Sequence, residues 1–215
     1  MMTSGYYFIF TVIVLIVLLL TDWKPIIAPH LSTKLTICSI VLLVIMTFVP
    51  YHIPIVGVSF VTVTAPVFLL GIIAIAILIY RIVAVKSIVN LLLSVGGITV
   101  CYTFIRHLYF VDPIYYWLSP QHDALLLAAC INVLLIRNAA EQFAVATITL
   151  LLGNVWLERL NSPSTHFYLG SLEWWDEFAL TILFVVVLRI VYYYFLHFKL
   201  SMQHKWSLFR KGGST

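Results

Sequence analysis

Residues 173–198 read EWWDEFALTILFVVVLRIVYYYFLHF, and the rest of the chain is organised around this stretch. It opens with acidic and aromatic residues, continues without charge from Phe178 to Leu188, and then meets Arg189 and three tyrosines. Aromatic and cationic residues on either side of an apolar core are typical of a helix that crosses a membrane. The stretch therefore predicts a spanning helix over 174–198.

The composition extends this prediction to the whole chain. Of the 215 residues, 63% are hydrophobic and 9% are charged. Soluble domains carry roughly 45–50% apolar and about 25% charged residues. We therefore expect an all-α, polytopic transmembrane helix bundle, with residues 1–215 forming a single transmembrane domain that ends in a short basic cytoplasmic tail at 199–215. The net charge of +4 comes mainly from ends and loops, so it indicates orientation and not nucleic-acid binding.

About seven segments are apolar enough to be candidate spans, each of which needs about 20 residues. The fifth and sixth are short, so a six-helix bundle with one re-entrant segment stays open. The first lacks a cationic start and a cleavage site, and we expect it to be a retained helix. The candidates are Tyr6–Thr21, Leu31–Val49, Phe60–Tyr80, Ser87–Tyr109, Asp123–Ile136, Glu141–Leu157 and Trp174–Phe198.

The loop charges predict the orientation of these spans. Lys and Arg concentrate in cytoplasmic loops. With seven spans, nine Lys and Arg fall on the side of the C-terminus, and only Arg106 and Arg159 fall on the other side. We therefore expect the N-terminus outside and the C-terminus in the cytoplasm of a multi-pass cell-membrane protein.

Three outer links then contain many aromatic and histidine residues: residues 50–54, 109–117 and 161–173. Trp and Tyr often form a belt at the depth of the lipid headgroups. A shallow outer pocket for a ligand or a partner is the other interpretation.

Polar residues inside the spans are costly in lipid and tend to face the interior of a bundle. Asn90, Ser94, Gly97 and Cys101 follow a helical spacing that places them along one face. This stripe predicts either a seam where helices pack closely or one wall of a polar path between the fourth, fifth and sixth spans. The three cysteines, all in apolar segments, are expected to be packing residues.

The other members of such a path or of an outer pocket lie further along the chain. Asn132 and Asn154 are in the fifth and sixth spans, and Glu158 follows Asn154 by one helical turn. Glu158 either forms a solvated edge with the next residue, Arg159, or meets Asp176 or Glu177, where adjacent carboxylates could share a proton or bind a cation. Arg189 is expected to anchor the last helix by reaching the interface, with an internal ion pair as the alternative.

The order of these features resembles a known family. A short N-terminal helix comes first, the pair Asp112-Pro113 follows the fourth span, and an outer link leads into the acidic start of the last helix. This order resembles that of the small YphA-like membrane proteins of endospore-forming Gram-positive bacteria, over most of the chain. The resemblance implies a bacterial plasma-membrane protein, and it assigns no catalytic residue and no activity.

Three functions fit the sequence. The chain has no His-Glu-x-x-His, Cys-x-x-Cys or Gly-x-Ser-x-Gly motif, so we expect no metal or other cofactor, and a non-enzymatic accessory or interaction protein comes first. Its partners would be the lipid bilayer and another membrane protein or a second copy of the chain. The second function is a small transporter or channel, and the third is an enzyme with a site at the outer face. That enzyme's acid–base groups would come from His107, Asp112, His122, His166, Asp176 and Glu177.

Overall fold

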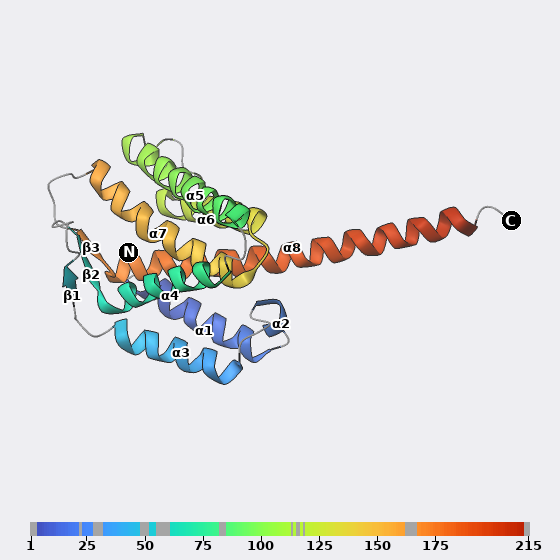
Figure 1. Ribbon diagram of the computed structural model, residues 1–215, viewed down its shortest axis with the longest axis horizontal. Helices are drawn as coiled ribbons and strands as arrows, with labels where there is room; N and C mark the ends of the chain where they lie inside the picture. Colours follow the sequence, from blue (N-terminus) through green and yellow to red (C-terminus); the bar gives the residue numbers. More distant parts are fainter. Residues whose placement is uncertain are drawn as a thin grey trace.

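A computed structural model describes residues 4–21, 23–27, 32–47, 52–54, 61–81, 85–112, 114, 117, 119–161 and 167–212. In this part of the chain, eight helices and three short strands are present (Figure 1). In chain order, the elements are α1 (Tyr6–Leu20), α2 (Lys24–Ile27), α3 (Thr33–Thr47), β1 (His52–Pro54), β2 (Val61–Thr64), α4 (Ala65–Arg81), α5 (Val85–Val111), α6 (Pro120–Leu135), α7 (Ala139–Asn161), β3 (Phe167–Leu169) and α8 (Leu172–Gly212).

Every predicted span overlaps one of the apolar helices, which confirms an all-α fold with several candidate spans. Among the described residues, three stretches are long and apolar enough to cross a membrane: Ile88–Val111, Ala139–Asn161 and Leu172–Leu196. The remaining apolar helices α1, α3, α4 and α6 have 15 to 17 residues. A helix of that length covers about 22–26 Å, which is less than the ~30 Å of a typical hydrocarbon core.

The small sheet was not predicted, and it corrects the start of the third predicted span. Residues 61–64 form β2 and not the first turn of a helix, and α4 begins at Ala65. The run Val-Thr-Val-Thr is β-branched throughout and alternates buried with half-buried residues, as a strand with one covered face does. β2 lies in the middle of the sheet, antiparallel to β1 and parallel to β3. The sheet therefore joins parts of the first and third predicted outer links.

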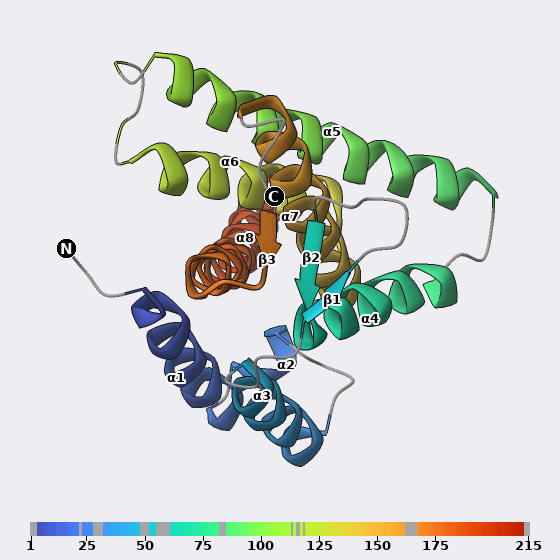
Figure 2. The ribbon, with the colours of Figure 1, turned by 90° about the vertical axis from the view of Figure 1, so that its left-hand side faces the viewer.

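Helices α7 and α8 lie side by side in the middle of the bundle (Figure 2), and α8 joins the α1 side to the α6 side. Helix α8 packs against α6 on one side and against α1 on the other, while α7 packs against α5 and α4. The aromatic start of α8 belongs to the core, because Trp174 is 3% exposed and Trp175 is 1% exposed. Their rings contact Phe178, and Trp175 also contacts Phe8 of α1. These two tryptophans therefore hold helices together and do not lie in a belt at the headgroups.

The C-terminal half of α8 leaves the bundle. The helix has 41 residues and runs to Gly212, so the described part of the predicted basic tail continues the helix. Figure 1 shows this part projecting well beyond the other elements. Between 191 and 196, every side chain is exposed. Residues 213–215 of the predicted tail lie outside the described part.

Candidate functional site

A buried ion pair joins α5 to α8. The Nη1 atom of Arg106 lies 2.7 Å from Oε1 of Glu177, and the two side chains are 15% and 12% exposed. Tyr102 of α5 and Asn154 of α7 complete the group. We refer to Tyr102, Arg106, Asn154 and Glu177 as the Arg106 cluster.

Hydrogen bonds connect all four members of the Arg106 cluster. Arg106 Nη1 also donates to Tyr102 Oη at 2.7 Å and to Asn154 Oδ1 at 3.2 Å. Asn154 Nδ2 donates to Glu177 Oε2 at 3.3 Å. The single hydroxyl proton of Tyr102 can go to Asn154 Oδ1 at 3.0 Å or to Glu177 Oε2 at 3.4 Å. The charges thus neutralise each other inside the bundle, and one compact group links three helices.

The local sequence explains how the cluster assembles. Tyr102 and Arg106 are four residues apart, so they lie on the same face of α5. Gly153 lets α7 approach that face, because a Cβ at this position would lie 2.5 Å from Cδ1 of the Tyr102 ring. The hydroxyl of Thr103 donates to the Gly153 carbonyl at 3.5 Å. The glycine therefore places the next residue, Asn154, within reach of Tyr102 and Arg106.

The neighbouring acid, Asp176, has a different partner. Its Oδ2 accepts from the backbone N–H of Gly5 at 2.7 Å, and its Oδ1 accepts from that of Phe8 at 2.8 Å. Both donors belong to the start of α1, where backbone N–H groups have no partner within the helix and where a negative charge is stabilising. Gly5 has a φ of +93°, a conformation that glycine adopts without strain. Asp176 therefore caps α1 from the neighbouring helix α8.

A second polar group lies elsewhere in the bundle, and Asn132 belongs to it. Asn132 Nδ2 donates to the Gln142 carbonyl at 2.8 Å, and Gln142 Nε2 donates to the Ile136 carbonyl at 2.6 Å. Arg189 donates to Gln142 Oε1 at 2.9 Å and to the Ile26 carbonyl at 3.0 Å. Gln142 and Asn154 are twelve residues apart on α7, a distance of about 18 Å along the axis. Asn132 and Asn154 are therefore held in separate groups.

The other predicted site residues have local partners or lie at the surface. Asn90 is exposed on α5, and Glu158 is half-buried near the end of α7. His107 Nδ1 lies 2.8 Å from Asn161 Oδ1, and Asp112 accepts from the Ile114 N–H at 3.3 Å. His122 pairs with Ser119 at 2.8 Å, and His166 lies outside the described residues.

The structure thus brings together Asn154 and Glu177 from the predicted set, and it adds Tyr102 and Arg106. Sequence reasoning missed these two because it counted Arg106 as a loop charge. The signal was present: Thr99, Tyr102, Thr103 and Arg106 share a helical face inside an apolar segment. Among the described residues, no three His, Cys, Asp or Glu side chains are grouped so that they could hold a metal ion.

These features define a polytopic helical membrane protein whose helices are tied together by buried polar groups. The sequence model of the YphA-like integral membrane proteins matches residues 5–209. The chain therefore belongs to this family, which confirms the resemblance, the integral membrane location and the lipid bilayer as its surroundings. No curated protein and no solved structure matches the chain.

Proposed function

We propose that the chain is a non-enzymatic accessory protein of the membrane, which binds another protein through the end of α8. The observation that supports this proposal is the extension of α8 beyond its apolar span. The span ends at Leu196 and the helix continues to Gly212. Figure 1 shows no other described element beside this extension.

The extension covers residues 197–212. An isolated helix as short as this extension is marginal in water when nothing packs against it. The extension also lacks acidic residues, whereas it contains Lys199, Lys205, Arg210 and Lys211. A protein with an acidic surface would both cover the helix and match its charge. A membrane-protein partner or a second copy of the chain remains compatible with this proposal.

The polar groups inside the bundle support a structural role and not acid–base chemistry. Glu177 is engaged by Arg106, Asp176 caps α1, and His107 pairs with Asn161. Each of these candidates for catalysis at the outer face thus has its own partner. A general base needs a reacting proton within hydrogen-bond reach, and these groups contact protein atoms instead.

Site-specific photo-crosslinking tests the proposal with a matched pair of positions. Phe198 of α8 is 64% exposed and Phe104 of α5 is 63% exposed. A benzophenone amino acid at Phe198 should give one discrete protein adduct in native membranes, and the same probe at Phe104 should give lipid adducts alone. An adduct of twice the chain mass that persists after purification and reconstitution would identify a second copy as the partner.

Lipid adducts alone at both positions would contradict the accessory role. In that case, a saturable uptake of solute by the reconstituted protein would favour the second candidate, a small transporter. The Arg106 cluster is the observation behind that candidate, because ionisable residues within a membrane often mark a transport path.

We further propose seven spans with the N-terminus outside and the C-terminus in the cytoplasm. The sheet supports this arrangement, because seven alternating spans place β1, β2 and β3 on the same side. In a chain whose three cysteines are replaced by serine, the exposed residue Ser171 should lie outside and the exposed residue Arg137 inside. A membrane-impermeant maleimide should label Ser171→Cys in intact cells, and Arg137→Cys only after permeabilisation. The reverse pattern would invert the topology.

A further inference from the structure

The extension of α8 beyond its span carries a stripe of large apolar residues. In a helix of 3.6 residues per turn, positions 198, 202, 206 and 209 share one face, within an arc of about 80°. These positions hold Phe198, Met202, Trp206 and Phe209. Phe198 is 64% exposed and Met202 is 45% exposed. We refer to these four residues as the α8 stripe.

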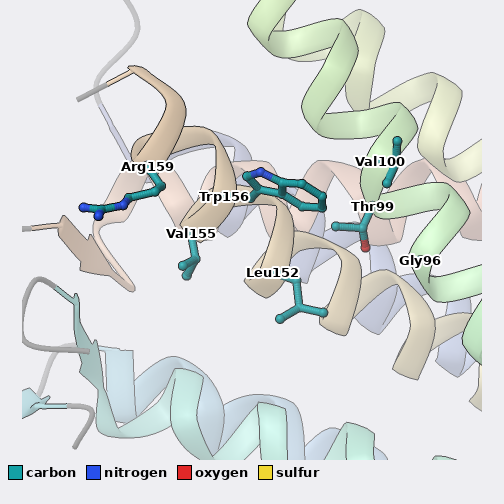
Figure 3. Close-up of a pocket in the computed structure, with 7 residues that line it drawn as sticks. All are labelled: Gly96, Thr99, Val100, Leu152, Val155, Trp156 and Arg159. Atoms are coloured by element: carbon teal, nitrogen blue, oxygen red, sulfur yellow. The ribbon is translucent and has the colours of Figure 1, made fainter. Parts of the chain in front are cut away.

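Lipid accounts for the exposed apolar side chains of the spans, but not for those of the α8 stripe. For example, Val100, Leu152 and Trp156 line an open groove between α5 and α7 (Figure 3). They belong to candidate spans, so the hydrocarbon of the bilayer can cover them. The α8 stripe begins after Leu196, where the span ends. A contiguous apolar patch in water usually marks a surface that binds another molecule.

Cations border the α8 stripe on both sides. By the same helical repeat, Lys199 and Arg210 fall about 20–40° beyond one edge of the stripe, and Lys205 falls about 20° beyond the other edge. Lys211 falls on the opposite face, and residues 197–212 contain no acid. The surface that covers the stripe is therefore expected to be apolar in its centre and acidic along both edges.

A second copy of the chain does not match this charge pattern. Two copies with the same topology run parallel in the membrane, so both would bring the same cations and no acid to the contact. Like charges that meet in an interface oppose binding. The charges of the extension therefore select a different protein.

The continuous course of α8 separates the stripe from the lipid surface. Trp206 lies ten residues beyond Leu196, which is about 15 Å along the helix axis. To lie on the headgroups, the extension would have to turn sharply where the span ends. Sharp kinks occur mainly at proline, at glycine or where the helical hydrogen bonds are interrupted, and residues 172–211 contain neither proline nor glycine. Figure 1 shows the extension projecting away from the bundle as a continuous helix.

We propose that the α8 stripe is a helical docking motif for an apolar groove with acidic edges on another protein. The inference rests on the proposed accessory function, and it adds the chemistry of the partner. The stripe occupies the groove, and the cations at its edges pair with acids of the partner. Amphipathic helices bind such grooves through apolar residues that are three and four positions apart. The contact also supplies the packing that a short isolated helix lacks.

Two matched pairs of alanine substitutions test the stripe in the full-length protein in intact cells. The readout is the yield of the discrete protein adduct from the benzophenone amino acid at Phe198. Trp206→Ala with Phe209→Ala removes two residues of the stripe, and it should lower this yield by about tenfold or more. Leu200→Ala with Leu208→Ala removes two apolar residues off the stripe, and it should leave the yield within about twofold of the wild-type value. Alanine has the highest helix propensity, so neither pair unwinds the extension.

A second comparison tests the acidic edges. Lys205→Glu reverses a cation at the edge of the stripe, and it should lower the adduct yield by about fivefold or more, because it brings like charges together. Lys211→Glu reverses a cation on the opposite face, and it should leave the yield within about twofold of the wild-type value.

Four results would overturn the inference. Equal yields for the two alanine pairs would mean that the partner binds outside the stripe, although a discrete adduct would still support the accessory role. Equal yields for Lys205→Glu and Lys211→Glu would mean that no acid lines the edge of the groove. An adduct of twice the chain mass would assign the stripe to a second copy, and lipid adducts from a probe at Trp206 would place the extension on the bilayer. The absence of any protein adduct at Phe198 in the wild-type protein would instead contradict the accessory role, and the inference with it.

Discussion

Glu177→Gln is expected to lower the free energy of unfolding by about 3–5 kcal/mol, which is the usual cost of removing one partner from a buried ion pair. The substitution keeps the shape of the side chain and removes its charge. Arg106, which is 15% exposed and lies 2.7 Å from Glu177, then remains buried without a counter-charge. The unfolding midpoint in mild detergent, measured by tryptophan fluorescence against increasing denaturant, checks this expectation.

Two further variants separate the ion pair from other effects. Glu173→Gln removes an exposed carboxylate one turn earlier on α8, in the first turn of the helix. We expect it to lower the free energy of unfolding by less than about 1 kcal/mol, because a negative charge at an exposed helix N-terminus contributes about 0.3–1 kcal/mol. The double variant Arg106→Gln with Glu177→Gln leaves no unpaired charge, so it should be more stable than either single variant. If instead the loss of unfolding free energy in the double variant equals the sum of the losses in the two single variants, then Arg106 and Glu177 are not energetically coupled.

The sequence predicted the apolar helices well, because hydrophobic length is a local property. The last predicted span began at Trp174, and α8 begins at Leu172. Partners far apart in the chain have no such local signal. Asp176 and the N–H of Gly5 are separated by 171 positions, and nothing near either residue indicates that they meet. The roles of Asp176 and Glu177 therefore could not be distinguished before the structure was known.

The polar stripe on α5 shows a second limit of sequence reasoning. Asn90 and Gly97 are exposed, while Tyr102 and Thr103 on another face of the helix are buried. Small and polar residues in a span favour contact between helices, but a hydroxyl can also be satisfied within its own helix. The hydroxyl of Ser94 donates to the Asn90 carbonyl at 2.8 Å. It therefore needs no partner helix, and its position in the sequence does not identify the buried face.

The short strands, like the Asp176 cap of α1, depend on partners that are far apart in the chain. Residues 61–64 precede a long apolar helix, and their hydrophobicity alone extends that helix toward the N-terminus. β3 is more than 100 positions away, yet it pairs with β2 from Val61 to Val63. Gly170 follows this strand with a φ of +103°, and a Cβ there would lie 2.0 Å from the Thr64 hydroxyl oxygen. The Gly170 backbone thus closely approaches the Thr64 side chain near the end of the third link, and only the folded structure reveals this contact.

Gly153→Ala should lower the free energy of unfolding by about 1–3 kcal/mol, the usual cost of overpacking a filled core. The new methyl group would lie 2.5 Å and 2.8 Å from two carbon atoms of the Tyr102 ring. The ring cannot turn away freely, because its hydroxyl accepts from Arg106 at 2.7 Å. Gly97→Ala is the control, since it adds the same methyl group to α5 in open space.

The control separates packing from helix propensity. Alanine is favoured over glycine in a helix interior by about 1 kcal/mol, so Gly97→Ala should leave stability unchanged or raise it. Gly153→Ala gains the same helix propensity, but it should still lose stability. The new methyl group displaces the Tyr102 ring, and this weakens the hydrogen bonds of Tyr102 within the Arg106 cluster. If both variants unfold at the same denaturant concentration as the wild-type protein, then α5 and α7 can separate without cost, and the cluster does not fix their distance.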